Sequence, residues 1–170
     1  MASSGKKFLV PFLLSLLVWY GVYDLVIKPS YLYDALVIQG IATHAHLILS
    51  LLGYDVLISD VLYSGYLNHI AVLGSDGVVI GPGCDGLVIM ALFFLFILFM
   101  PGKISNKLWF IPLGLLGIHL FNVLRVVCLA LLMKFHPEWL DFNHDYTFTV
   151  LMYSFVFLLW VVWVKFYAKV

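Results

Sequence analysis

The 170-residue sequence contains little charge. Only 11% of its residues are Asp, Glu, Lys or Arg, whereas 64% are hydrophobic, and the formal net charge is zero. A water-soluble domain has about a quarter of charged residues to cover its surface. The composition therefore predicts a single integral membrane domain over residues 1–170, in contact with the lipid bilayer. Without net charge or a basic run interleaved with aromatic residues, nucleic acid is not an expected partner.

Cysteine is also scarce, because Cys84 and Cys128 are the only two. Two cysteines outside a Cys-x-x-Cys pair are too few for a disulfide framework. A lone Cys within a helix is usually a buried, inert thiol, and we expect this of Cys128. His44 and His46 are two residues apart and point to different helix faces, so no metal pair is expected there. The His-Glu-x-x-His, Gly-x-Gly-x-x-Gly and Gly-x-Ser-x-Gly motifs are absent, and we expect neither metal nor cofactor.

Long apolar runs are what the sequence has in place of charge. Four of them are long enough, or nearly so, to cross a bilayer: residues 8–27, 85–100, 108–133 and 147–167. No Ala-x-Ala site follows the first run, which favours an uncleaved span over a signal peptide. At ~1.5 Å per residue the second run covers only ~24 Å, which is short against a hydrocarbon core of ~30 Å. Its start at Asp85 should therefore lie at, or slightly inside, the membrane surface.

The segment 34–54 is harder to assign. Its polar residues Gln39, Thr43, His46 and Ser50 follow one another by four, three and four positions, which places them on one helical face. An amphipathic helix of this kind can lie on the membrane surface, line a site or span the bilayer. Farther on, two short β-branched runs joined by Gly74-Ser-Asp-Gly77 predict a β-hairpin within residues 63–83.

The lysines distinguish these topologies, because basic residues concentrate on the cytoplasmic side. If 34–54 stays outside, two lysines fall on the outer side, Lys28 and Lys134, and six on the inner side: Lys6, Lys7, Lys103, Lys107, Lys165 and Lys169. If 34–54 crosses the membrane, four of the inner lysines move to the outer side, and the excess of lysines is then on the outer side. These four are Lys103, Lys107, Lys165 and Lys169. We therefore predict an all-α membrane bundle of about four spans, an amphipathic helix and a short outer hairpin, with both termini inside.

Cys84 is the first candidate for chemistry. It lies in Gly81-Pro-Gly-Cys-Asp-Gly86, where glycines let the backbone approach a substrate closely. A helix is predicted to start directly after it, and a helix N-terminus favours a thiolate. Asp85 opposes this effect unless it turns away or caps the helix. A small apolar residue in a turn is the simpler interpretation of this position.

Arg125 and His144 are the other two candidates. Arg125 is the only arginine, and it lies within an apolar span, where a guanidinium costs ~2.5–3.5 kcal/mol to insert. Such a residue usually faces a polar interior and has a functional role. Alternatively, its side chain snorkels toward the outer membrane interface. Asn122 lies one turn away on the same face. His144 precedes the last span, where it can act as a base near neutral pH or belong to an interface cluster. In the lysine-derived topology all three candidates lie near the outer surface.

The same residues form three short motifs in a fixed order. Cys84-Asp-Gly86 starts one span, Asn122-Val-Leu-Arg125 lies in the next, and His144 precedes the last. This order, over roughly residues 78–156, resembles the exosortases and archaeosortases. Many members have about eight spans, so the chain looks like a compact, core-only bacterial member.

The resemblance implies a membrane cysteine peptidase or transpeptidase. Such an enzyme recognises a C-terminal sorting signal on secreted proteins, made of a short motif such as Pro-Glu-Pro, an apolar helix and a basic tail. It cuts near the motif and passes the acyl group to a cell-surface acceptor. The implied roles are nucleophile for Cys84, oxyanion stabiliser for Arg125 and base for His144. The supporting residues are Asn122, Gly83, Asp85 and Gly86. The implied location is the bacterial plasma membrane, with the active site on the extracytoplasmic side.

Three other functions stay open on the sequence alone. A thiol-redox membrane protein would use Cys84 with Cys128. A non-catalytic helper subunit would use Arg125 and Asn122 as polar contacts between helices. A haem- or metal-binding protein would need paired histidines at matching depths in the membrane.

Overall fold

The computed structural model describes residues 2–27, 32–62 and 65–168. The long helices are α1 (Ala2–Val22), α3 (Leu32–Leu51), α4 (Leu87–Phe99), α5 (Ile104–Phe135) and α7 (Phe148–Phe166). Three strands, β1 (Val56–Ser59), β2 (His69–Val72) and β3 (Val78–Val79), lie between α3 and α4. Short helical turns make up the rest: η1 (Tyr23–Ile27), η2 (Pro137–Trp139), α6 (Leu140–Phe142) and η3 (Asn143–Thr147).

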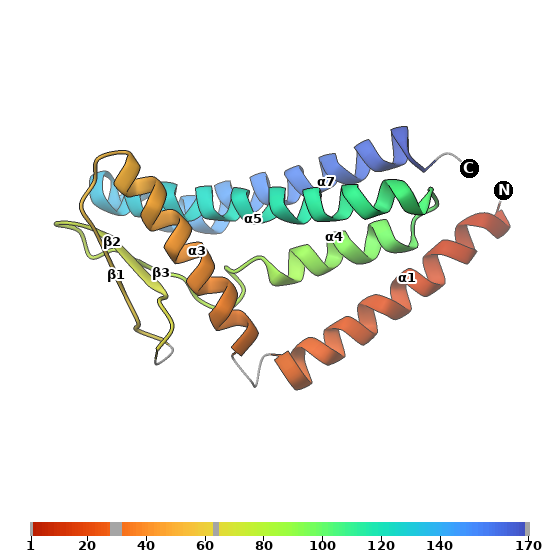
Figure 1. Ribbon diagram of the computed structural model, residues 1–170, viewed down its shortest axis with the longest axis horizontal. Coiled ribbons are helices and arrows are strands. Elements are labelled where there is room, and N and C mark those ends of the chain that lie inside the picture. The colour runs from red at the N-terminus through yellow and green to blue at the C-terminus, as the bar shows by residue number, and fades with distance from the viewer. Residues whose placement is uncertain (1, 28–31, 63–64, 169–170) are drawn as a thin grey trace.

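The helices α4, α5 and α7 run alongside one another, and α1 leans against α4 (Figure 1). Both chain termini and the α4–α5 turn lie at one end of this bundle, which we call the termini end. The three strands, the start of α4 and the turns before α7 lie at the other, the sheet end. Helix α3 crosses α5 obliquely there. Successive long helices of the bundle therefore alternate in direction, as expected for consecutive membrane spans.

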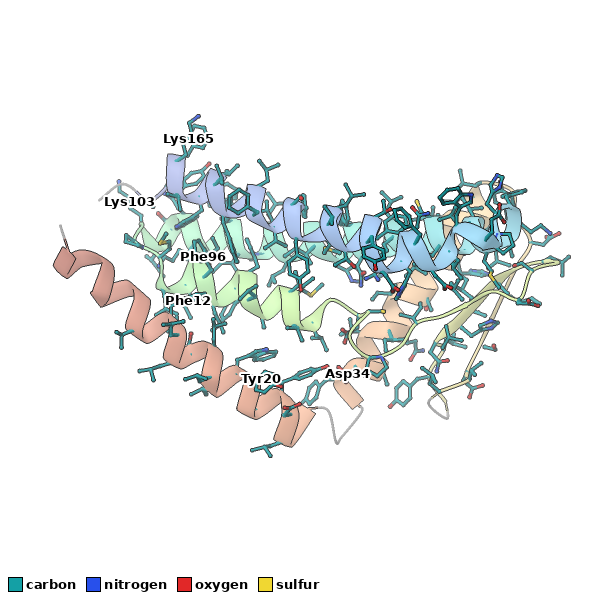
Figure 2. All side chains as sticks on the ribbon, turned by 180° about the vertical axis from the view of Figure 1, so that it is seen from behind. Phe12, Tyr20, Asp34, Phe96, Lys103 and Lys165 are labelled. Carbon is teal, nitrogen blue, oxygen red and sulfur yellow. The ribbon has the colours of Figure 1, made fainter. Side chains whose placement is uncertain are left out.

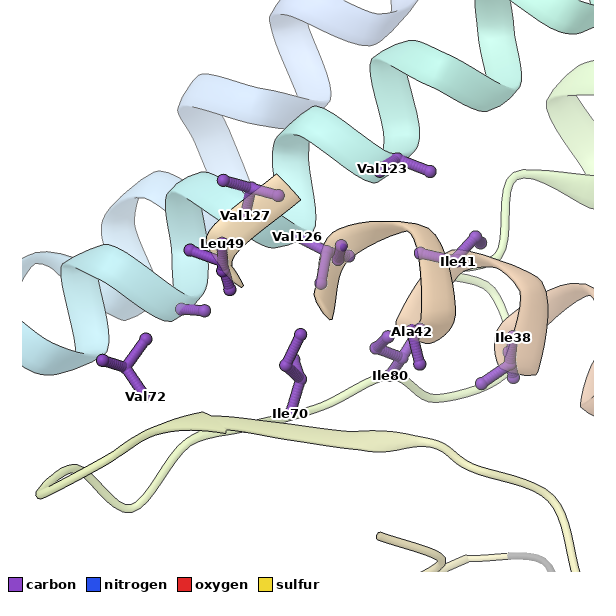
Figure 3. Close-up of a cluster of buried hydrophobic side chains, with 12 residues drawn as sticks. Ile38, Ile41, Ala42, Leu49, Ile70, Val72, Ile80, Val123, Val126 and Val127 are labelled. Carbon is purple, nitrogen blue, oxygen red and sulfur yellow. The ribbon is translucent and has the colours of Figure 1, made fainter. Parts of the chain in front are cut away.

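Two apolar clusters hold the fold together. At the sheet end, α3, the sheet and α5 pack around Ile41, Ile70 and Val126 (Figure 3). In the bundle, α4, α5 and α7 pack around Phe93, Ile118 and Trp163. The sheet-end cluster is important for the site because it fixes β2 and β3 against the part of α5 that carries the sequence-predicted polar residues.

The lysines divide between the two ends of the molecule. Lys103 and Lys165 lie at the termini end (Figure 2), and Lys107 there donates a 2.7 Å hydrogen bond to the carbonyl of Leu98. Lys134 lies at the sheet end, where its Nζ donates a 2.6 Å hydrogen bond to the carbonyl of Leu73. The fold thus separates these lysines as the predicted topology does.

The predicted apolar runs all form helices, but their number as membrane spans stays a prediction. Three helical stretches in the described residues are long and apolar enough to cross a membrane: Tyr33–Leu51, Ile104–Phe135 and Pro137–Phe166. The first is the segment that the lysine argument leaves on the outer side. Phe12–Leu25 and Leu87–Phe99 are apolar but shorter. Helix α4 has 13 residues, which at ~1.5 Å per residue is only ~20 Å.

The predicted hairpin is present in the described part of residues 63–83, and it belongs to a larger sheet. Strands β2 and β3 pair antiparallel around the Gly74–Gly77 turn. Strand β1, which the sequence analysis does not predict, pairs antiparallel with the other side of β2, from Val56↔Val72 to Ser59↔His69. A four-residue run carries too weak a local pattern, and it becomes a strand only through pairing with β2. The sheet order is β1-β2-β3, so β3 is an edge strand.

Candidate active site

The thiol of Cys84 and the imidazole of His144 meet at the sheet end of the bundle. Cys84 lies in the turn between β3 and α4, where its N–H donates a 3.1 Å hydrogen bond to the carbonyl of Gly81. His144 lies in η3, directly before α7. Their side chains are 3.3 Å apart, from Sγ to Nε2, although 60 residues separate them in the chain. This distance is within reach of direct proton transfer.

A carboxylate lies on the other side of the imidazole. The Nδ1 of His144 is 2.8 Å from Oδ1 of Asp145. Such a contact orients the ring and keeps the proton on Nδ1, which leaves Nε2 free to accept one from the thiol. The Asp145 side chain is 61% exposed, so water screens its charge, and its effect is mainly to orient the ring. No role was predicted for Asp145, because the sequence around His144 also fits an ordinary cluster of polar residues at the membrane interface.

Arg125 points toward the same place from α5. Its Nη2 is 3.5 Å from the main-chain carbonyl oxygen of His144, which is a weak hydrogen bond. Its Nε is buried and has no hydrogen-bond partner among the described residues. A buried guanidinium nitrogen without a partner is costly. The guanidinium therefore has an N–H group that is free to donate a hydrogen bond beside Cys84 and His144. Such an arrangement suits the binding of an anion.

Asn122 fixes the backbone of the turn that carries Cys84. Its Nδ2 donates a 2.8 Å hydrogen bond to the main-chain carbonyl of Cys84, and its side chain is buried. Gly83 and Gly86 both have positive φ angles, of 86° and 80°. Only glycine adopts such angles routinely. The sequence-predicted supporting residues are thus all in the turn or against it.

Asp85 lies two residues before α4 and is fully buried. Its Oδ1 accepts a 3.2 Å hydrogen bond from the N–H of Leu87, the first residue of α4. It therefore caps the helix and does not point at the thiol. Burial, against the lowering effect of the Leu87 hydrogen bond and with a smaller contribution from the neighbouring carboxyl of Asp34, raises the pKa of Asp85 to about 7. Near neutral pH much of Asp85 is uncharged, which weakens its opposition to a thiolate on Cys84.

Asp34, in the first turn of α3, was not predicted as part of the site. It is fully buried, and neither of its carboxylate oxygens has a hydrogen-bond donor among the described residues. The Oδ2 of Asp85 lacks a donor in the same way. Two carboxylates only accept hydrogen bonds, so a proton on one of them is needed to join the pair. The signal in the sequence that could have indicated it is an Asp at the start of a mostly apolar helix, which by itself does not reveal its burial beside Asp85.

Two cavities open on either side of the Cys84–His144 contact. We call them the strand-side cavity, of about 270 Å³, and the helix-side cavity, of about 280 Å³. Both are lined by Cys84, Arg125 and His144. The strand-side cavity is completed by β3, α5 and the α6 turn. The helix-side cavity is completed by residues of α4, η3 and α7, among them Ile89, Met152 and Tyr153.

The remaining cysteine and histidines stay outside this cluster. Cys84 and Cys128 are both free thiols. The Nε2 of His119 is 3.1 Å from Nδ1 of His44, a contact that joins α5 to α3. This pairing of residues 75 positions apart has no local sequence signal. Within the part of the chain that the structure describes, no three His, Cys, Asp or Glu side chains gather as a metal site.

Fold and site together define a helical membrane protein with a thiol, an imidazole and a guanidinium at one end of its bundle. The chain belongs to the transmembrane exosortase family, because the family model described as transmembrane exosortase (Exosortase_EpsH) matches residues 1–163. The comparisons with curated proteins and with solved structures gave no match. The family match confirms the resemblance drawn from the three motifs and extends it over nearly the whole chain.

Proposed function

We propose that the protein is a membrane cysteine peptidase or transpeptidase that cleaves C-terminal sorting signals of secreted proteins. The observation that supports this most is the 3.3 Å contact between Sγ of Cys84 and Nε2 of His144, with Arg125 lining the same two cavities. A nucleophile in hydrogen-bond contact with a base, and a base held by a third group, is the recurring geometry of activated nucleophiles. Membership of the exosortase family supports the proposed substrate class.

The first half of the reaction forms a thioester. Nε2 of His144 takes the proton from the Cys84 thiol, and the thiolate forms a C–S bond with the carbonyl carbon of the scissile peptide. The free N–H groups of Arg125 stabilise the oxyanion, in a site where low dielectric strengthens the interaction. The intermediate then collapses, the C–N bond breaks, and the leaving amine takes the proton from His144. The product is a thioacyl enzyme and a released C-terminal segment.

The second half transfers the acyl group. His144 takes a proton from an amine, a hydroxyl or water, and the resulting nucleophile attacks the thioester carbon. Collapse breaks the C–S bond, and the thiolate recovers the proton from His144. Asp145 keeps the imidazole in the same orientation through both halves. A surface acceptor gives transpeptidation, whereas water gives hydrolysis.

The proposed orientation places this site on the extracytoplasmic side of the bacterial plasma membrane. It is supported by the separation of Lys103 and Lys165 from Lys134 along the bundle and by the excess of lysines at the termini end, on the side where the positive-inside rule puts the cytoplasm. A secreted protein held by its C-terminal apolar helix would then present its short motif at the level of the sheet end.

The test is processing of reporters in cells. A panel of secreted reporters would be co-expressed with the full chain, each ending in a short polar motif, an apolar helix of about twenty residues and a basic tail. We expect loss of the tail in at least one reporter with the wild-type chain and with Cys128→Ser. We expect none with Cys84→Ala. Normal processing by Cys84→Ala would remove the nucleophile from the proposal.

The same variants separate the proposal from its rivals. A thiol-redox protein would be as damaged by Cys128→Ser as by Cys84→Ser. A non-catalytic subunit would carry a Cys84 that reacts with a maleimide no faster than an ordinary exposed thiol, and would leave every reporter uncut. The cysteine peptidase predicts fast labelling of Cys84 in the Cys128→Ser background.

A further inference from the structure

Strand β3 has one edge without a partner strand. The sheet order is β1-β2-β3, so β3 pairs with β2 only. Val78 stands opposite Ile70, and Val79 stands opposite His69. The N–H of Ile80 donates a 2.7 Å hydrogen bond to the carbonyl of Asn68, back toward β2. Because hydrogen-bonded and non-bonded pairs alternate along an antiparallel ladder, the N–H and C=O of Val79 must point to the free edge.

This free edge faces the active site. Residues 77–80 form one wall of the strand-side cavity, and Cys84, Arg125 and His144 line the same space. Leu140 and Asp141 lie across it. Among the described residues, no side chain or loop backbone takes up the two polar groups of Val79. The cavity therefore has an unpaired backbone donor and acceptor within the same space as the nucleophile.

The strand and the nucleophile are also coupled along the chain. Four residues separate Val79 from Cys84, and two of them, Pro82 and Gly83, restrict or require a special backbone conformation. The 3.1 Å hydrogen bond from the N–H of Cys84 to the carbonyl of Gly81 closes this turn. A ligand aligned on β3 is thereby aligned on the sulfur as well.

We propose that the substrate is bound as an extended segment that adds a fourth strand to the sheet, paired with the edge of β3 through the N–H and C=O of Val79. The inference rests on the proposed function and specifies how that site takes its peptide. Addition of a strand to an exposed edge supplies affinity through main-chain hydrogen bonds, and pockets for alternate side chains supply selectivity. Val126 and Leu129 line the cavity from α5, so every second side chain of the bound segment faces an apolar surface.

The sharpest variant is Val79→Pro, with Val79→Ala as its matched control. Proline removes the outward N–H and leaves the ladder to β2 intact, because the N–H of Val79 takes no part in that ladder. Alanine removes most of the side chain and keeps the N–H. Both variants lose the valine side chain that lines the cavity, so they are compared with each other. We expect reporter processing by Val79→Pro to be about tenfold below that of Val79→Ala, about the value of one lost hydrogen bond, while maleimide labelling of Cys84 stays within about twofold of wild type.

A second measurement uses the unaltered protein, so that folding of a variant is not at issue. Peptides that span the short motif of a processed reporter, each with one N-methylated amide at a successive position, would compete with maleimide for Cys84. Residues along a strand alternate in direction, so we expect N-methylation to abolish protection at every second position only.

The outcomes separate the two proposals. Equal processing by Val79→Pro and wild type, an equal loss in Val79→Pro and Val79→Ala, or protection that is indifferent to the position of the N-methyl group would each overturn strand addition while leaving the peptidase in place. If the wild-type chain leaves every reporter uncut, the proposed function fails, and strand addition fails with it.

Discussion

The side-chain amide of Asn122 donates a 2.8 Å hydrogen bond to the main-chain carbonyl of Cys84. It comes from the middle of α5, the longest of the described helices, and reaches the turn that carries Cys84. Gly86, on the other side of Cys84, is close enough that an added Cβ would lie 3.4 Å from Nδ2 of Asn122. One helix thus fixes the position of the turn from which the thiol projects.

Asn122→Ala should therefore loosen this turn. The partly buried carbonyl of Cys84 loses its donor, which costs about 1 kcal/mol. We expect a lower midpoint of thermal unfolding in detergent and at least a tenfold drop in reporter processing. Asn106→Ala, in the first turn of α5 at the far end of the molecule, is the matched control and should change neither. Wild-type processing by Asn122→Ala would show that the turn holds itself.

Gly86→Ala should act through the backbone. Its φ of 80° is unfavourable for residues with a Cβ, by roughly 1–2 kcal/mol, whereas the new methyl group meets Asn122 only at van der Waals distance. We expect both destabilisation and slower labelling of Cys84. Gly81→Ala is the control in the same turn, because its φ is not positive and a Cβ there meets nothing within 4 Å. Equal behaviour of the two variants would contradict this explanation.

Arg125→Lys should separate binding of an oxyanion from mere positive charge. Lysine keeps the charge but lacks the planar set of donors of a guanidinium. Loss of an oxyanion donor costs about 10²–10³ in rate, so we expect reporter processing to fall by that factor. Alkylation of Cys84 by iodoacetamide should be nearly unchanged, because this displacement of iodide develops no oxyanion. A parallel loss of labelling would mean that Arg125 acts on the thiol or on the fold.

Asp85→Asn should change how stability depends on pH. Burial raises the pKa of Asp85 from the ordinary 3.8 to about 7, so between these values the folded state holds a proton that the unfolded state releases. Stability of the wild type should therefore fall as the pH rises from about 4 to about 7. Asn keeps the acceptor for Leu87 and does not ionise.

We therefore expect the unfolding midpoint of Asp85→Asn to exceed that of wild type by a few degrees at pH 8, and the difference to shrink toward pH 5. Circular dichroism during heating across this pH range would measure it. Asp55→Asn, at the exposed start of β1, is the control and should follow the wild-type curve. A difference between Asp85→Asn and wild type that is constant with pH would contradict the raised pKa.

The local parts of the fold were predictable, because each depends on a pattern within a short window. Apolar runs predicted the helices, and the Gly74–Gly77 turn predicted the hairpin. Cys84, Arg125 and His144 were brought to one end by a topology derived only from lysines, and the structure places them around two shared cavities. Arg125 in particular was predictable, because a lone arginine in an apolar helix costs free energy and is rare there unless it has a function.

The parts that were not predicted all depend on partners distant in the chain. Strand β1 becomes a strand by pairing with β2. His44 meets His119 only because α3 crosses α5. Asp34 gains its importance from Asp85, about fifty positions later, through burial that no local pattern reveals. Each pairing depends on the packing of α3 and the sheet on α5. The hydrophobic pattern of a sequence predicts which surfaces are buried, but it does not predict which polar residues come into contact at the edges of those surfaces.

The strand-side and helix-side cavities have a kinetic consequence. Cys84 lines both cavities, so in the proposed reaction the departing segment of the substrate and an incoming acceptor need not use the same path. An acceptor already bound in one cavity could attack the thioester before the released segment leaves the other cavity and water replaces it. Initial-rate plots against donor and acceptor would then intersect, in place of the parallel lines of a strict ping-pong enzyme, and the ratio of transfer to hydrolysis would rise with acceptor occupancy.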